Sequence, residues 1–158
     1  MPDRIEKLAL LCTSPGGHAP SYPLHELAGL SEDERAARYL PIIDTRFTPE
    51  WLADHESDRN LVAMLAERQR GEKSDEVRRG EAEQLRARAG HDVADRLNRI
   101  AAPTLIAAGR YDGIAPLPNS EVIASRIAGS ELRVYEGGHA FFVQDRTALP
   151  EILDFLAT

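Results

Sequence analysis

The stretch PTLIAAGRYDGIAP, residues 103 to 116, runs from an apolar segment into an acidic turn. The apolar segment Pro103–Gly109 predicts a β-strand, with its proline at the strand entrance, a position that a strand tolerates. Asp112 follows in the turn directly after this segment. In a parallel sheet, functional side chains lie just past the carboxyl ends of the strands, so Asp112 is a candidate functional residue.

Two further segments have the pattern of strands. Lys7–Thr13 is a nearly unbroken apolar run that ends at a Ser-Pro-Gly-Gly sequence. It suits a strand that is buried on both faces of a parallel sheet. Glu131–Gly137 alternates instead, and its residues Leu132 and Val134 are predicted to point to one face of the sheet.

Helical patterns fill the long region between the first two strands. Ser31 and Glu34 have the spacing of a capping box, which predicts a helix that Pro41 kinks or ends. An apolar stripe at Leu61–Leu65 and a longer, more polar segment at Ser74–Ala89 predict two more helices.

Helices also precede and follow the remaining strands. Asp92–Ile100 has apolar residues at helical spacing and leads into the second strand. Asn119 or Ser120 is predicted to cap a helix that runs through Ile127, and Leu149–Leu156 closes the chain as a helix. The order strand, helical insertion, strand, helix, strand, helix predicts an α/β fold with about three parallel strands.

The composition argues against several classes of function. With 158 residues, the chain is long enough for one domain with a core. Its net charge of −7 argues against nucleic acid as a partner, because phosphate binding needs a basic surface. No apolar run is long enough to cross a bilayer and no signal peptide opens the chain, so we expect no membrane partner. Cys12 is the single cysteine, which rules out an internal disulfide and fits a cytoplasmic location.

The segment EGGHAFF, residues 136 to 142, places His139 after the third predicted strand. Asp112 occupies the corresponding position after the second strand. An acid and a histidine at the ends of neighbouring strands can share a hydrogen bond, in which the carboxylate fixes the imidazole tautomer and stabilises the imidazolium. The sequence therefore predicts that Asp112 orients His139, and that His139 is the general base of a nucleophilic triad.

These motifs resemble the carboxyl-terminal part of the α/β-hydrolase fold. The resemblance lies in HDVADRLNRIAAPTLIAAGRYDGIAP, in SELRVYEGGHAFFVQD and in the opening RIEKLALLCTSPGG. It implies that Asp112 is the acid after the family's seventh strand, that His139 is the histidine after its eighth, and that the opening is its sixth strand and loop. It also implies one structural domain, in which residues 1–21 form the first core strand and loop, 22–90 a helical cap-like insertion, and 91–158 the carboxyl-terminal core segment.

The family's nucleophile motif is missing from the chain. By the resemblance, a serine within Gly-x-Ser-x-Gly should lie upstream of these residues, together with the loop of the oxyanion hole. Gly109 and Gly113 have the right spacing, but Tyr111 stands between them. Cys12 and Ser14 follow the first strand and are alternative nucleophiles, although Cys12 has the pattern of a small buried residue and Ser14 that of a turn.

The resemblance implies hydrolysis of an ester, lactone or related acyl bond without a cofactor. We expect the chain alone to be inactive and to act on a small-molecule substrate only when completed. The strand Lys7–Thr13 would present an open apolar edge, which predicts a homodimer through that strand or an upstream chain that carries the nucleophile. The alternative is a non-catalytic module that self-associates. The other histidines lack metal-ligand spacing, so no metal site is expected.

Overall fold

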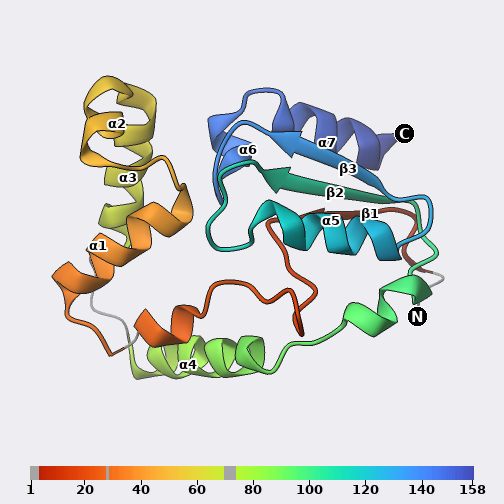
Figure 1. The fold of residues 1–158 in the computed structure, drawn as a ribbon, viewed down its shortest axis with the longest axis horizontal. Coiled ribbons are helices and arrows are strands. Elements are labelled where there is room, and N and C mark those ends of the chain that lie inside the picture. Colours follow the sequence, from red (N-terminus) through yellow and green to blue (C-terminus); the bar gives the residue numbers. More distant parts are fainter. Residues whose placement is uncertain (1–3, 28, 70–73) are drawn as a thin grey trace.

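The computed structural model describes residues 4–27, 29–69 and 74–158 (Figure 1). Its centre is a three-stranded parallel sheet in the order β1-β2-β3. The strands are β1 (Leu8–Leu11), β2 (Thr104–Gly109) and β3 (Glu131–Tyr135). The predicted α/β fold with about three parallel strands is therefore confirmed, and all three strands are shorter than predicted, the second by one residue only.

Strand β2 is the centre of the core, and all six of its residues are buried. Its side chains alternate between two clusters, because successive side chains of a strand point to opposite faces. Leu105 packs with Phe141 and Ile152 on one face. Ile106 packs with Ile123 and other residues on the opposite face.

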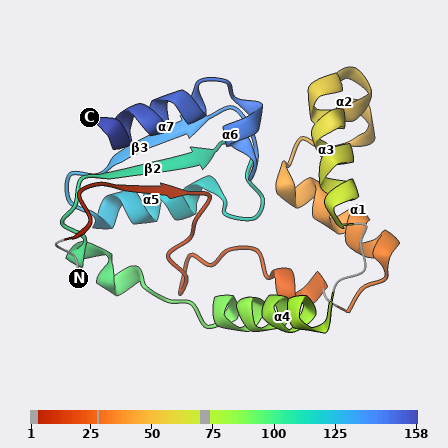
Figure 2. The ribbon, with the colours of Figure 1, turned by 180° about the vertical axis from the view of Figure 1, so that it is seen from behind.

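Helices cover both faces of the sheet, as Figure 2 shows from behind. On one face lie α6 (Phe141–Gln144) and α7 (Ala148–Ala157). On the other lie α5 (Leu117–Arg126) and the 3-10 helix η3 (Ala94–Arg99). These layers bury β2 and leave β1 at the edge, where it pairs with β2 alone among the described strands.

The region between β1 and β2 is helical, as predicted. Three of its helices stand beyond the carboxyl ends of β2 and β3, and α4 runs separately below them in Figure 1. None of the helices in the described part of the chain is both long and apolar enough to span a membrane. The elements of this region are η2 (Leu24–Leu27), α1 (Glu32–Ile43), α2 (Pro49–Asp54), α3 (Glu56–Gln69) and α4 (Asp75–Ala89).

The predicted capping box of Ser31 and Glu34 is present, but Pro41 does not end α1. The helix continues to Ile43, because proline removes only its own N–H and the amide of Asp44 still donates to the Leu40 carbonyl.

The predicted N-cap of α5 is wrong by three to four residues, because the observed N-cap is Pro116. The helix begins at Leu117, with Pro118 in its first turn, where proline is favourable because its missing N–H has no helical acceptor. Asn119 and Ser120 are therefore inside the helix and buried, rather than capping it. The Asn119 side chain instead donates to the Pro20 carbonyl, 3.0 Å away.

A close backbone contact joins the helical region to the sheet. A Cβ atom on Gly138 would lie 2.0 Å from the Ile43 oxygen and 2.6 Å from the Cα of Asp44. The amide of His139 donates to the same Ile43 oxygen at 2.6 Å. A Cβ on Gly109 would in turn lie 2.0 Å from the Gly138 oxygen. Only glycine lets these three backbone segments approach so closely.

We expect Gly138→Ala to lower the free energy of unfolding by about 1–3 kcal/mol, because its methyl group must push apart two backbone segments. Urea unfolding followed by circular dichroism measures this change. Gly80→Ala is the matched control, since Gly80 lies in α4 with no atom within 4 Å of the new Cβ. That variant should be more stable by about 0.5–1 kcal/mol. Equal stability of the two variants would show that the contact at Gly138 is loose.

Candidate active site

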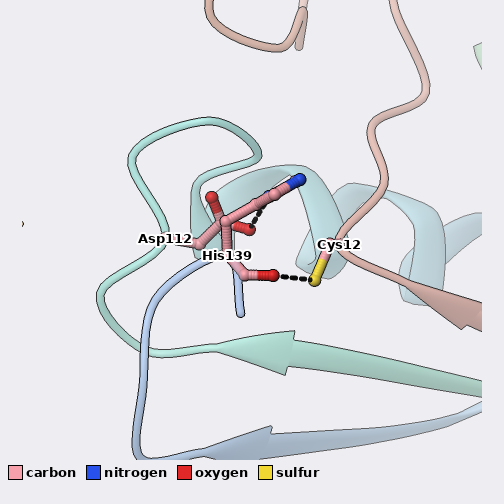
Figure 3. Close-up of side chains that lie close together, drawn as sticks. All are labelled: Cys12, Asp112 and His139. Atoms are coloured by element: carbon pink, nitrogen blue, oxygen red, sulfur yellow. Dashed lines mark hydrogen bonds and ion pairs between the residues drawn. The ribbon is translucent and has the colours of Figure 1, made fainter. Parts of the chain in front are cut away.

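Asp112 and His139 meet at the carboxyl ends of β2 and β3, as predicted. The Nδ1 atom of His139 lies 2.9 Å from Oδ2 of Asp112 (Figure 3). The Asp112 side chain is 1% exposed, whereas that of His139 is 34% exposed. The pair thus has a buried acid and an imidazole that solvent can reach.

Backbone amides hold the Asp112 carboxylate in place. Its Oδ1 atom accepts hydrogen bonds from the amides of Ile114 and Ala115, at 2.7 and 2.8 Å. An ionised carboxylate can only accept, so the proton in the contact with His139 belongs to Nδ1 of the imidazole. The Nε2 atom is then left as an acceptor, which is the tautomer that a general base requires.

A second polar network fixes the loop that carries His139, and the sequence analysis did not identify it. The Gln144 side chain accepts from the amide of Gly138 and donates to Asp44 and Asp58. Asp44 is fully buried and forms a bidentate ion pair with Arg46. Through the amide of Gly138, these residues hold the loop that positions the imidazole. No local pattern in the sequence marks them, since Gln144 and Asp44 are 100 positions apart.

A pocket of about 210 Å³ opens beside the imidazole. A second pocket of about 360 Å³ adjoins it, with Ser14, Ser21, Arg88 and His91 lining both. The lining of the smaller pocket is completed by Cys12, Thr13 and His139. The space next to the imidazole is therefore polar and open to solvent, and it is lined by the loop after β1 and by residues at and after the end of α4.

Cys12 lies beside His139 but is poorly suited to be a nucleophile. Its Sγ atom donates to the carbonyl of His139 at 2.9 Å, not to the imidazole (Figure 3). Burial, and then the negative charge of Asp112, raise the pKa of Cys12 to about 12. A nucleophilic cysteine needs the thiolate, and this environment opposes thiolate formation.

The same three residues bring potential metal ligands together. One ligand atom each from Cys12, Asp112 and His139 lies within 4.8 Å of the others. The carboxylate already has three N–H partners, and the thiol keeps its proton well above neutral pH. Because a metal ligand must be deprotonated and must have a free lone pair, this donor set fits a metal poorly.

We expect Cys12 to alkylate slowly with iodoacetamide in the native chain. A pKa of about 12 keeps its thiolate fraction at pH 8 about a thousandfold below that of an ordinary thiol. The native rate should therefore be roughly a thousandfold lower than the rate of the same chain in urea. The native rate should rise about tenfold per pH unit as long as the chain stays folded. Asp112→Asn should increase the rate modestly, because it removes a charge that raises the pKa of Cys12. Equal native and unfolded rates would show a thiolate available for catalysis.

Comparisons with known proteins identify the fold of the chain. No protein-family model matches the chain. A poly(3-hydroxyalkanoate) depolymerase from Ectopseudomonas oleovorans is 36% identical over 74 residues, which are 46% of this chain and 26% of that protein.

Solved structures match nearly the whole chain. A hydrolase from Pseudomonas aeruginosa PA01 has 27% identity and a TM-score of 0.68, over 99% of this chain and 57% of its own. The enol-lactonase from Burkholderia xenovorans LB400 has 21% identity and a TM-score of 0.74, over 99% of this chain and 58% of its own. The chain thus spans little more than half the length of these α/β-hydrolases. It has the fold of the carboxyl-terminal portion of the α/β-hydrolase superfamily.

Proposed function

We propose that this chain supplies the acid and the general base of an enzyme that hydrolyses an ester, a lactone or a related acyl bond. The observation that carries the proposal is the 2.9 Å contact between Nδ1 of His139 and the buried Asp112, with the imidazole beside a polar pocket. The enol-lactonase and the depolymerase among its relatives have names that fit this class of reaction.

The chemistry follows from the tautomer of His139. Its Nε2 atom takes the proton of a nucleophilic hydroxyl as that oxygen attacks the acyl carbon, and Asp112 stabilises the imidazolium that forms. The same proton then passes to the leaving alcohol. Water repeats the sequence on the acyl intermediate, with His139 again as the base. No cofactor takes part in these steps.

The nucleophile in this proposal comes from outside the 158 residues. The hydroxyl and thiol groups at the pocket are those of Cys12, Thr13, Ser14 and Ser21. The Cys12 thiol is protonated and bonded to a carbonyl, and the Ser21 hydroxyl accepts from Arg88. In the described part of the chain, none of the four is hydrogen-bonded to the imidazole. A serine on a preceding segment would complete the triad. The chain alone is then inactive, and its small-molecule substrate binds productively only after completion. Residues 22–90 act as the cap that selects this substrate. The cytoplasm is the proposed location of the protein.

Two adjacent open surfaces offer a place for such a segment. The first is the free edge of β1, within the predicted pairing strand Lys7–Thr13. The second is the outer side of α7, which contacts β1. Three leucines on one face of this helix are exposed. Their exposed fractions are 48% for Leu149, 56% for Leu153 and 44% for Leu156. A further strand and helix from the segment that carries the nucleophile would bury both surfaces.

A second copy of the chain is the other occupant of the β1 edge. An apolar strand edge pairs or aggregates, and pairing with its own copy gives a closed homodimer. In that case the chain is a self-associating module without catalysis, and Asp112 and His139 have only a structural role.

We expect the purified chain not to react with a fluorophosphonate probe, and a chain extended by the nucleophile-bearing segment to react and to hydrolyse nitrophenyl esters. In the extended enzyme, Asp112→Asn should lower kcat by about 10³–10⁴-fold, because the imidazole loses its tautomer partner. His139→Ala should remove activity to a similar extent. Labelling of the short chain that depends on His139 would contradict the proposal, as would an extended enzyme indifferent to both substitutions.

Pairing at the β1 edge is tested by Ala9→Pro. The amides of Leu8 and Cys12 donate toward β2, so by alternation the amide of Ala9 faces the open edge. Proline there removes a donor of the new ladder and leaves the β1–β2 ladder intact. We expect a dimer mass for the parent chain and for Ala9→Val by light scattering, and a monomer mass for Ala9→Pro. A dimer that survives Ala9→Pro would place the interface elsewhere.

A further inference from the structure

Arg88 is a half-buried cation that lines a pocket together with His139. Its Nε atom donates to the hydroxyl of Ser21 at 2.8 Å, and this is a neutral group. Among the described residues, no carboxylate forms an ion pair with it. Other arginines of the chain do have such partners, as Arg46 has Asp44 and Arg133 has Glu131.

The position of Arg88 is set by the backbone and not only by its side chain. It lies in the last turn of α4, and the residues that follow this helix pack against the loop after β1. The amide of Gly17 donates to the His91 carbonyl, and the amide of Val93 to the Pro15 carbonyl. Gly16 has φ +73°, and a Cβ there would lie 1.9 Å from the His91 oxygen.

Both pockets of the site have Arg88 in their lining. The smaller pocket is also lined by His139, so a molecule in it lies next to both residues. Burial lowers the pKa of Arg88, and the charge of the nearby Asp112 opposes this change. Asp112 is hydrogen-bonded to His139 and two amides, and it forms no ion pair with Arg88. A desolvated cation in this position gains from a bound anion.

We propose that Arg88 binds a carboxylate carried by the acyl substrate, so that the site acts on anionic esters or lactones in preference to neutral ones. This inference rests on the proposed hydrolysis. The guanidinium nitrogens not used by Ser21 form a planar fork that matches a carboxylate. The carboxylate would anchor one end of the substrate near Arg88, and the acyl carbon would lie near Nε2 of His139.

The test is calorimetric binding of adipate, a six-carbon dicarboxylate, to the whole chain at fixed ionic strength. Adipamide is the neutral probe of the same length. We expect adipate to bind more tightly than adipamide, and Arg88→Gln to weaken adipate binding by about tenfold to a hundredfold. Arg88→Lys should retain part of the affinity, since it keeps the charge but loses the fork.

Arg86→Gln is the matched control, because Arg86 is exposed and lies in the same last turn of α4. It should change adipate binding less than twofold, a size typical of a distant surface charge in salt. Equal binding of adipate and adipamide, or equal effects of Arg88→Gln and Arg86→Gln, would overturn the inference. Circular dichroism of the variants confirms that they fold.

Failure of this subsite and failure of the proposed function give different results. Arg88-dependent adipate binding with no hydrolysis by the extended enzyme would keep the subsite and remove the function. Equal hydrolysis of neutral and anionic esters, unaffected by Arg88→Gln, would keep the function and overturn the subsite.

Discussion

The close packing of three backbone segments determines most of this structure. Gly109 ends β2, Gly138 lies in the loop after β3, and Ile43 ends α1, and these segments touch with no room for a Cβ atom. The contact brings the amide of His139 onto the Ile43 carbonyl. It thereby fixes the histidine loop against the helical region and brings the imidazole to Asp112. Stability and site geometry thus depend on the same two glycines.

The charges around this contact fall into two kinds. Asp112 and Asp44 are buried, and each is satisfied within the chain, by amides and His139 or by Arg46 and Gln144. A buried charge without such partners would be costly, so these acids are fixed parts of the framework. Arg88 differs, because its only hydrogen-bond partner among the described residues is the Ser21 hydroxyl. The framework is complete internally, while the pocket has a positive charge available for a ligand.

Among the described strands, each outer strand of the sheet pairs with β2 alone. Strand β2 is buried between two neighbours, but β1 has a free edge, and α7 exposes a stripe of leucines beside it. The part of the fold that orients His139 has its buried polar groups hydrogen-bonded within the described part of the chain. The related α/β-hydrolases have further chain, since the match covers just over half their length.

The sequence by itself determined the three parallel strands, the helices between them and the meeting of Asp112 with His139. These follow from local patterns, because apolar periodicity, capping residues and strand order act over short stretches of chain. The catalytic role of this pair stays a prediction. Only the tertiary structure decided that Gln144 joins Asp44 to the histidine loop, that Arg88 donates to Ser21 at the pocket, and that Cys12 is bonded to a carbonyl. Those contacts join residues 67 to 127 positions apart, and no local pattern encodes a distance in space.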